Sequence, residues 1–354
     1  MFRLFPCPTR VGIRRVGDPG RKSPVLVTCN FYLTVNRLLR SLKGLDVWLL
    51  VAQSKGVNVW CAACGNVFNT RSVVSSIKTS GIEQIVDHRT LILSPLSAPG
   101  VSAAGVQMQT GWTVRWGPVR ASDLPRYLAE GCNRKEGDKR VTYNWLERID
   151  TGAGALFPLF FLGLLGFMFF GRHLLIDYLA VGTGAFLLFM LTSPWIPGKR
   201  GLTKVLFFEM PLGVLLFVWE LIGRSSGFSV RADIIIAMAM FFLYGSELGG
   251  LAPNMKSELD PFLAKLGVGA IGNVALAGAV RTEILNGYRE LTYDQDKCIG
   301  CRCCVEVCPV AVWGFDKEAK KAVFGKRYAC TACRACLVQC PSGAIQAPLV
   351  RASS

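Results

Sequence analysis

Two short runs of the sequence hold nine of its fourteen cysteines. They read CIGCRCCVEVCP (298–309) and CTACRACLVQCP (330–341), and each matches the spacing C-x2-C-x2-C-x3-C-P. In this spacing three cysteines of one run bind three corners of a [4Fe-4S] cube, and the fourth, directly before proline, binds the other cube. The pattern predicts two clusters, one held by Cys298, Cys301, Cys304 and Cys340 and the other by Cys330, Cys333, Cys336 and Cys308.

A pair of zinc sites is the competing interpretation of these two runs. Zinc bound by four thiolates would not require the fourth cysteine and its following proline twice at the same offset. We therefore favour the iron–sulfur clusters, with Cys303 outside the ligand pattern. Two neighbouring clusters form an electron relay, so the runs predict electron transfer.

A further stretch, GVNVWCAACGN (56–66), places Cys61 and Cys64 directly after Trp60. It is compatible with a thioredoxin-like dithiol, with half of a zinc site, or with one thiolate that faces the metal of a cofactor. A thioredoxin-like site needs its first cysteine at a helix start directly after a strand, whereas SKGVN separates Trp60 from the apolar run 46–53.

Zinc and histidine-ligated cobalt both lack ligands in this part of the sequence. The chain has only two histidines, His88 and His173, while Cys29 and Cys132 are isolated. No D-x-H-x-x-G motif, which is common where a histidine binds the cobalt of a corrinoid, is present. A cysteine thiolate on a corrinoid cobalt and a redox dithiol therefore remain as the two interpretations.

Short apolar runs alternate with amphipathic segments before residue 150. The runs typical of buried strands are 23–29, 46–53, 83–88, 90–94 and 112–118. Segments with the apolar spacing of helices are 32–44, 70–81 and 122–131, and 131–140 is a polar surface turn. This alternation predicts a Rossmann-like α/β domain with a mainly parallel sheet.

The middle of the chain is strongly apolar, in keeping with a mean hydropathy of +0.37. Its apolar segments are 154–171, 174–194, 203–222, 232–252 and 262–280. A membrane crossing needs about 20 residues, which the first four segments approach or reach. We predict a helical transmembrane domain with four crossings and a weaker fifth segment.

Basic residues outnumber acidic ones by 40 to 24, and by 21 to 10 within the first 150 residues. A basic excess beside a bilayer marks the cytoplasmic side, and no nucleic-acid recognition motif accompanies it. The first residues lack the apolar core of a secretory signal. These features predict a multi-pass protein of the cytoplasmic (inner) membrane whose two flanking domains both face the cytoplasm.

Three stretches in the N-terminal part carry a resemblance to a known family. They are SPVLVTCNFYLTVNRLLRSLKGLDVWLLVAQSKGVNVWCAA, LILSPLSAPGVSA and GWTVRWGPVRASDLPRYL. They resemble the corrinoid protein of microbial mercury methylation, itself similar to the large subunit of the corrinoid iron–sulfur protein of the acetyl-CoA pathway. The partner of that family is a ferredoxin with two C-x2-C-x2-C-x3-C-P runs, so residues 13–345 look like both partners fused.

The resemblance implies a cap helix near 58–66, where the family motif N-[VI]-W-C-A-[AG]-G-K begins. The residues that match in place are Asn58, Val59, Trp60, Cys61, Ala62 and Ala63. Cys61 would be the catalytic residue, as the lower axial ligand of a cobalamin-type corrinoid cobalt, with Asn58 and Trp60 shaping the helix around it. The implied reaction passes methyl from a donor protein or folate-type donor to Hg(II), and the clusters, supplied by an external electron donor, reduce cobalt.

Two features depart from the family pattern. Cys64 and Gly65 stand where the motif continues with glycine and lysine, and no residue after Cys340 is a cysteine, whereas mercury ferredoxins typically end in a cysteine pair. Two alternatives follow: the same machinery with another soft methyl acceptor, or a membrane-bound electron-transfer protein. The expected fold class combines an α/β corrinoid-binding domain (13–150), an α-helical transmembrane domain (151–285) and an α+β dicluster ferredoxin domain (288–348).

Overall fold

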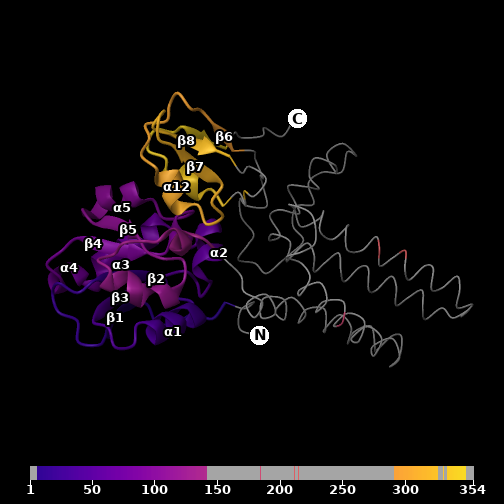
Figure 1. Cartoon of the computed structure of the whole chain (residues 1–354). Coiled ribbons are helices and arrows are strands. Elements are labelled where there is room, and N and C mark those ends of the chain that lie inside the picture. The colour runs from indigo at the N-terminus through magenta and orange to yellow at the C-terminus, as the bar shows by residue number, and fades with distance from the viewer. Residues whose placement is uncertain are drawn as a thin grey trace, which may run out of the picture. The chain divides into compact units, whose positions relative to one another are not determined.

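The computed structural model describes residues 6–141, 184, 211, 214, 291–325, 330 and 333–347 (Figure 1). Residues 6–141 form an α/β domain, and the described residues from 291 onward form a smaller domain that we call the cysteine-rich domain. Both lie within one compact unit of the chain.

The α/β domain is built on a five-stranded sheet in the order β1-β3-β2-β4-β5. The strands are β1 (Gly12–Val16), β2 (Val25–Cys29), β3 (Val47–Ala52), β4 (Thr90–Leu93) and β5 (Thr113–Trp116). The last four run parallel to one another, and β1 pairs antiparallel with β3 at one edge.

The central strands are apolar on both faces because helices cover both sides of the sheet. Every residue of β2 is buried, whereas β5 at the opposite edge alternates exposed and half-buried residues. Alternate residues of β2 enter different cores: Val25 and Val27 pack in one, and Leu26 packs in the other.

Helices flank the sheet as two layers. The larger core contains α2 (Val59–Cys64), α3 (Thr70–Ser80), α4 (Ile82–Ile85) and α5 (Ala103–Thr110), around the fully buried Phe68, Ile77 and Trp112. The smaller core contains α1 (Tyr32–Ser41) and α6 (Leu124–Ala129), around Leu42 and Tyr127. Short 3-10 turns η1 (Pro95–Ser97), η2 (Ala121–Asp123) and η3 (Glu136–Lys139) complete the connections.

Four of the five predicted strands are confirmed as β2, β3, β4 and β5, and the three predicted helices as α1, α3 and α6. The prediction of a strand at 83–88 is wrong, because the chain turns through α4 there after Gly81 takes a left-handed conformation (φ 72°). Strand β1 was not predicted: its sequence GIRRV lacks an apolar run and pairs only with β3.

The cysteine-rich domain repeats one pattern twice. Its elements are β6 (Thr292–Tyr293), α12 (Cys303–Val307), β7 (Trp313–Asp316), β8 (Lys321–Phe324), α13 (Ala335–Gln339) and β9 (Ile345–Gln346). β6 pairs with β9 and β7 with β8, both antiparallel. Each helix starts after a left-handed arginine, Arg302 (φ 62°) or Arg334 (φ 64°), that directly follows a cysteine of its run.

The predicted transmembrane domain requires a correction. The longest helix in the described part of the chain is α3, whose eleven residues span about 16 Å, roughly half of a bilayer core. No helix among the described residues is long and apolar enough to cross a membrane. The predicted segments 154–171, 174–194, 203–222, 232–252 and 262–280 lie outside the described residues, apart from three isolated positions.

The membrane part of the predicted fold class is therefore wrong for the structure as described, and the predicted multi-pass inner-membrane localisation falls with it. The α/β part agrees with the observed sheet. The predicted boundaries near 150 and 288 also lie outside the described residues and stay predictions.

Candidate functional site

Helix α2 follows the carboxyl end of β3, where ligands of parallel sheets commonly bind. Asn58 caps the helix, and its Oδ1 accepts a hydrogen bond from the Cys61 backbone N–H at 2.9 Å. The Asn58 Nδ2 also donates to the Cys61 Sγ at 3.3 Å. Cys61 is exposed, so the cap holds a solvent-facing sulfur in one orientation.

The other motif residues divide into two groups by burial. Ala62 and Ala63 are 0% and 2% exposed and pack in the larger core, so they anchor the helix and do not present themselves to a ligand. Val59 and Trp60 are half-buried. Of the predicted cofactor-binding residues, the structure thus brings Asn58 and Cys61 together at the surface and assigns the two alanines to packing.

Cys64 lies at the end of α2 and is half-buried. Burial raises the pKa of its thiol well above the ordinary value, and the neighbouring thiols of Cys333 and Cys61 raise it further. Cys64 is therefore protonated at neutral pH. A nucleophilic or metal-binding sulfur needs to be a thiolate, so Cys61 and not Cys64 is the candidate on this helix.

The loop that leads into α2 is held by a buried asparagine that sequence reasoning missed. Asn30 Oδ1 accepts hydrogen bonds from the Ser54 N–H at 2.9 Å, the Ser54 hydroxyl at 2.9 Å and the Gly56 N–H at 3.0 Å. Gly56 has φ +71°, and a Cβ there would lie 2.4 Å from the Pro8 nitrogen. The only sequence signal was a polar residue directly after the apolar run 23–29.

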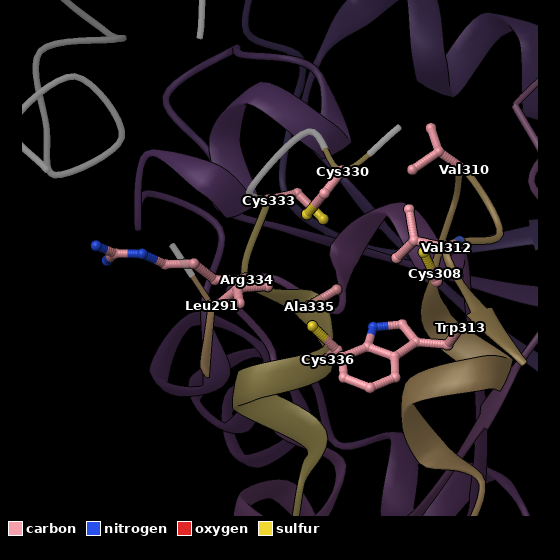
Figure 2. Close-up of a pocket in the computed structure, with 10 residues that line it drawn as sticks. All are labelled: Leu291, Cys308, Val310, Val312, Trp313, Cys330, Cys333, Arg334, Ala335 and Cys336. Atoms are coloured by element: carbon pink, nitrogen blue, oxygen red, sulfur yellow. Dashed lines mark hydrogen bonds between the residues drawn. The ribbon is translucent and has the colours of Figure 1, made fainter. Parts of the chain in front are cut away.

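In the cysteine-rich domain, four cysteines from the two separate runs line one hollow with about 260 Å³ of empty space, part of it open to solvent (Figure 2). They are Cys308, Cys330, Cys333 and Cys336. This is the grouping that the spacing predicts for one cluster. Within the described ranges, no three His, Cys, Asp or Glu side chains converge on a single point as they would around one metal ion.

Trp313 forms one wall of this hollow, stacked on Phe324 with ring centroids 4.5 Å apart. Its indole Nε1 is buried and makes no hydrogen bond of normal geometry, although it lies close enough to Cys336 to affect that thiol. Burial and the charge of Cys333 raise the pKa of Cys336, whereas the Trp313 indole acts in the opposite direction. A buried donor beside thiols suits a cluster, because N–H groups commonly hydrogen-bond to cluster sulfurs. The hollow therefore fits an iron–sulfur group.

The other predicted set consists of Cys298, Cys301, Cys304 and Cys340. Cys298, Cys304 and Cys340 belong to the apolar core of the domain, and Cys301 is exposed. Burial raises the pKa of Cys304 to about 12, with further contributions from Cys301, Cys298 and Cys340. Since these contributions require proximity, all four thiols share one neighbourhood.

Fold and thiols together define an α/β domain joined to a domain of the dicluster type. Residues 290–341 match the family model of the 4Fe-4S dicluster domain. Residues 5–128 match the family model described as CO dehydrogenase/acetyl-CoA synthase delta subunit. The predicted dicluster domain and the predicted similarity to an acetyl-CoA pathway protein are thereby confirmed.

Curated relatives carry the same signal for the α/β domain. The gamma subunit of the acetyl-CoA decarbonylase/synthase complex from Methanopyrus kandleri is 38% identical over 135 residues, 37% of this chain and 27% of the relative. The gamma subunit from Archaeoglobus fulgidus is 32% identical over 133 residues, 37% of this chain and 28% of the relative. The chain thus spans about a quarter of the length of these relatives.

Proposed function

We propose that this protein is a corrinoid-dependent methyltransferase with its own electron relay. Cys61 would provide the thiolate that holds the cobalt of a corrinoid, and the two cysteine sets would hold two [4Fe-4S] clusters. When bound, the corrinoid supplies a cobalt centre that takes up and releases the methyl group. The similarity of residues 5–128 to acetyl-CoA decarbonylase/synthase subunits supports this class of chemistry.

The observation that carries the proposal is the exposed Cys61 Sγ, which accepts the Asn58 amide N–H at 3.3 Å. A hydrogen bond to sulfur favours the charged thiolate over the thiol. It also fixes the direction in which the sulfur faces, because Asn58 is itself tied to the Cys61 backbone. A soft thiolate is a suitable cobalt ligand, so the donor set fits a corrinoid.

The two cysteine sets would hold clusters that supply electrons to the cofactor of the α/β domain. Trp313 supports this role, since its buried N–H would meet a sulfur of the second cluster. The thiols that line the hollow come from both runs, as the relay requires.

Hg(II) is the acceptor implied by the resemblance of residues 58–63 to the mercury-methylation cap motif. The acetyl-CoA decarbonylase/synthase relatives favour a second candidate, in which the methyl group passes to an acetyl-CoA-synthesising partner. The same α2 site serves either acceptor, so activity assays must separate them.

The cofactor is tested by anaerobic purification from a host supplied with corrinoid, followed by visible spectroscopy. We expect corrinoid bands whose positions change in Cys61→Ala and are unchanged in Cys132→Ala. Cys132 is a suitable control because it packs against the smaller core on the other face of the sheet. Wild-type protein with full iron content and no corrinoid bands would refute the proposal.

The acceptor is tested by charging the loaded protein with a labelled methyl group and adding Hg(II) alone. Labelled methylmercury identifies Hg(II) as an acceptor. Retention of the label in the presence of Hg(II), with release to an acetyl-CoA-synthesising enzyme, would assign the second candidate.

A further inference from the structure

Gln339 is the last residue of α13 and connects the cysteine-rich domain to the α/β domain. Its Nε2 donates to the Ala98 carbonyl at 2.9 Å and to the Val101 carbonyl at 2.7 Å. Its Oε1 accepts the Ala103 backbone N–H at 3.1 Å. The side chain is 8% exposed. The three hydrogen bonds of this side chain thus go to the segment that leads from η1 into the first residue of α5.

An apolar contact lies beside Gln339. Ala98 of the α/β domain packs with Val307 of α12 and Ala335 of α13, all at most 1% exposed. Val307 and Gln339 occupy the same place in the two cysteine runs, directly before the fourth cysteine. The equivalent positions of the two helices therefore contact the same surface of the α/β domain. Val307 makes an apolar contact there and Gln339 makes a polar one.

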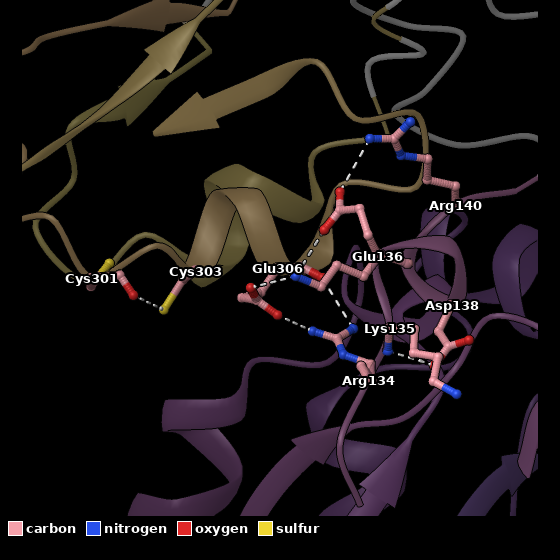
Figure 3. Close-up of polar contacts among 9 residues, drawn as sticks. Arg134, Lys135, Glu136, Asp138, Arg140, Cys301, Cys303 and Glu306 are labelled. Carbon is pink, nitrogen blue, oxygen red and sulfur yellow. Dashed lines mark hydrogen bonds and ion pairs between the residues drawn. The ribbon is translucent and has the colours of Figure 1, made fainter. Parts of the chain in front are cut away.

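A second polar contact fixes the rotation of the domain. The Glu306 carboxylate of α12 pairs with Arg134 (Figure 3). It also pairs with Lys139, at 2.9 Å. The Val141 N–H donates to the Pro309 carbonyl at 2.9 Å. Arg134 is only 8% exposed, whereas the Glu306 side chain is 38% exposed, so this ion pair is only partly shielded from screening by salt.

The two cysteine sets differ in their surroundings as a result. Cys333 of the second set packs against the apolar contact formed with Ala98, together with Trp116 of β5. On the first set, Cys301 is exposed and the neighbouring Ile299 is 67% exposed. The second set therefore adjoins the α/β domain at Cys333, whereas the first set reaches solvent at Cys301.

We propose that the cysteine-rich domain is docked in this one orientation, so that electrons enter at the first cluster and leave from the second toward α2. An external one-electron reductant is oxidised, the first and then the second cluster are reduced and reoxidised in turn, and the acceptor on the α/β domain gains the electron. The exit step rests on the proposed function, whereas the docking and the entry step do not.

Docking is tested on the full chain by hydrogen exchange at two reporter amides, Ala103 and Val141. Gln339→Ala should accelerate exchange of the Ala103 amide by about tenfold or more, since a buried hydrogen bond is lost there. Gln346→Ala, whose side chain bonds only within its own domain, should leave it unchanged. Rapid exchange of both reporter amides in the wild type would overturn the docked arrangement.

Direction is tested by stopped-flow reduction with dithionite, an anionic donor. Ile299→Asp should slow cluster reduction through charge repulsion, whereas Met108→Asp, on an exposed residue of α5, should not. Gln339→Ala should leave cluster reduction unchanged and slow the spectral change of bound corrinoid. Equal entry rates in Ile299→Asp and wild type, or slower cluster reduction in Gln339→Ala, would overturn the proposed direction.

The two proposals fail in distinguishable ways. A protein without corrinoid refutes the proposed function, yet its Ala103 exchange and cluster reduction still test the docking and the entry step. A corrinoid-loaded Gln339→Ala protein with lost Ala103 protection and wild-type cobalt reduction would overturn the exit step alone.

Discussion

Replacing Asn30 with alanine is expected to destabilise the α/β domain and to loosen the loop that positions Cys61. The Asn30 side chain is 2% exposed, and its Oδ1 accepts three hydrogen bonds. In the variant the Gly56 N–H loses its acceptor inside the protein. The Ser54 hydroxyl keeps the Val57 carbonyl, and the Ser54 N–H keeps the Gln53 side chain.

The magnitude follows from these partners. One stranded buried donor costs about 1–3 kcal/mol, and two weakened hydrogen bonds add about 1 kcal/mol. We expect a loss of about 3 kcal/mol, which corresponds to roughly 10 °C in Tm for a domain of this size. Thermal unfolding followed by circular dichroism measures the shift, and the alkylation rate of Cys61 reports on the loop.

Asn133→Ala is the matched control, because the Asn133 amide bonds a single carbonyl at an exposed position. We expect it to change Tm by no more than about 2 °C, as surface substitutions usually do. If the Tm of Asn30→Ala differed from that of the control by no more than this margin, the hydrogen bonds of Asn30 would not be what holds the loop before α2.

Three further substitutions test other parts of the structure. Trp313→Phe removes the buried N–H beside the second cysteine set and should lower the reduction potential of one cluster only. A redox titration followed by electron paramagnetic resonance measures both potentials, and equal shifts of the two would contradict the placement of Trp313 beside the second cluster. The pKa of the Cys64 thiol is raised from 9.0 in the folded protein, so above pH 9 the unfolded protein loses this proton first and the free energy of unfolding decreases as the pH rises. The denaturant midpoint should therefore decrease less with pH in Cys64→Ala than in the wild type. Parallel plots of midpoint against pH for the two proteins would refute this. Gly56→Ala should cost more stability than Gly44→Ala, because both have positive φ but only Gly56 has backbone within 3 Å of the added Cβ; equal melting temperatures would argue against the close approach.

Local patterns in the sequence predicted several features of the described structure. The cysteine spacing grouped Cys308 with the second run, and these thiols line one hollow. Apolar runs predicted the parallel strands, because burial on both faces of a sheet requires continuous apolar residues. The resemblance of residues 58–63 to a cap-helix motif predicted the short helix that carries Cys61.

Apolar patterns predicted the type of secondary structure less reliably, because both strands and helical turns bury apolar residues. The apolar residues of the run 83–88 are Ile85 and Val86, and they pack in the larger core from a helical turn and its exit, not from a strand. Five apolar segments predicted membrane crossings, yet no helix in the described ranges is suited to one.

The sequence by itself determined which residue types could bind metal and in what order they occur, because ligand spacing within a run is a local property. Only the tertiary structure decided which groups hold them in place. Asn30 contacts a loop 24 residues away, and Gln339 contacts a carbonyl 241 residues away. No periodicity encodes such distant pairs; they exist because folding buries polar side chains that then need partners.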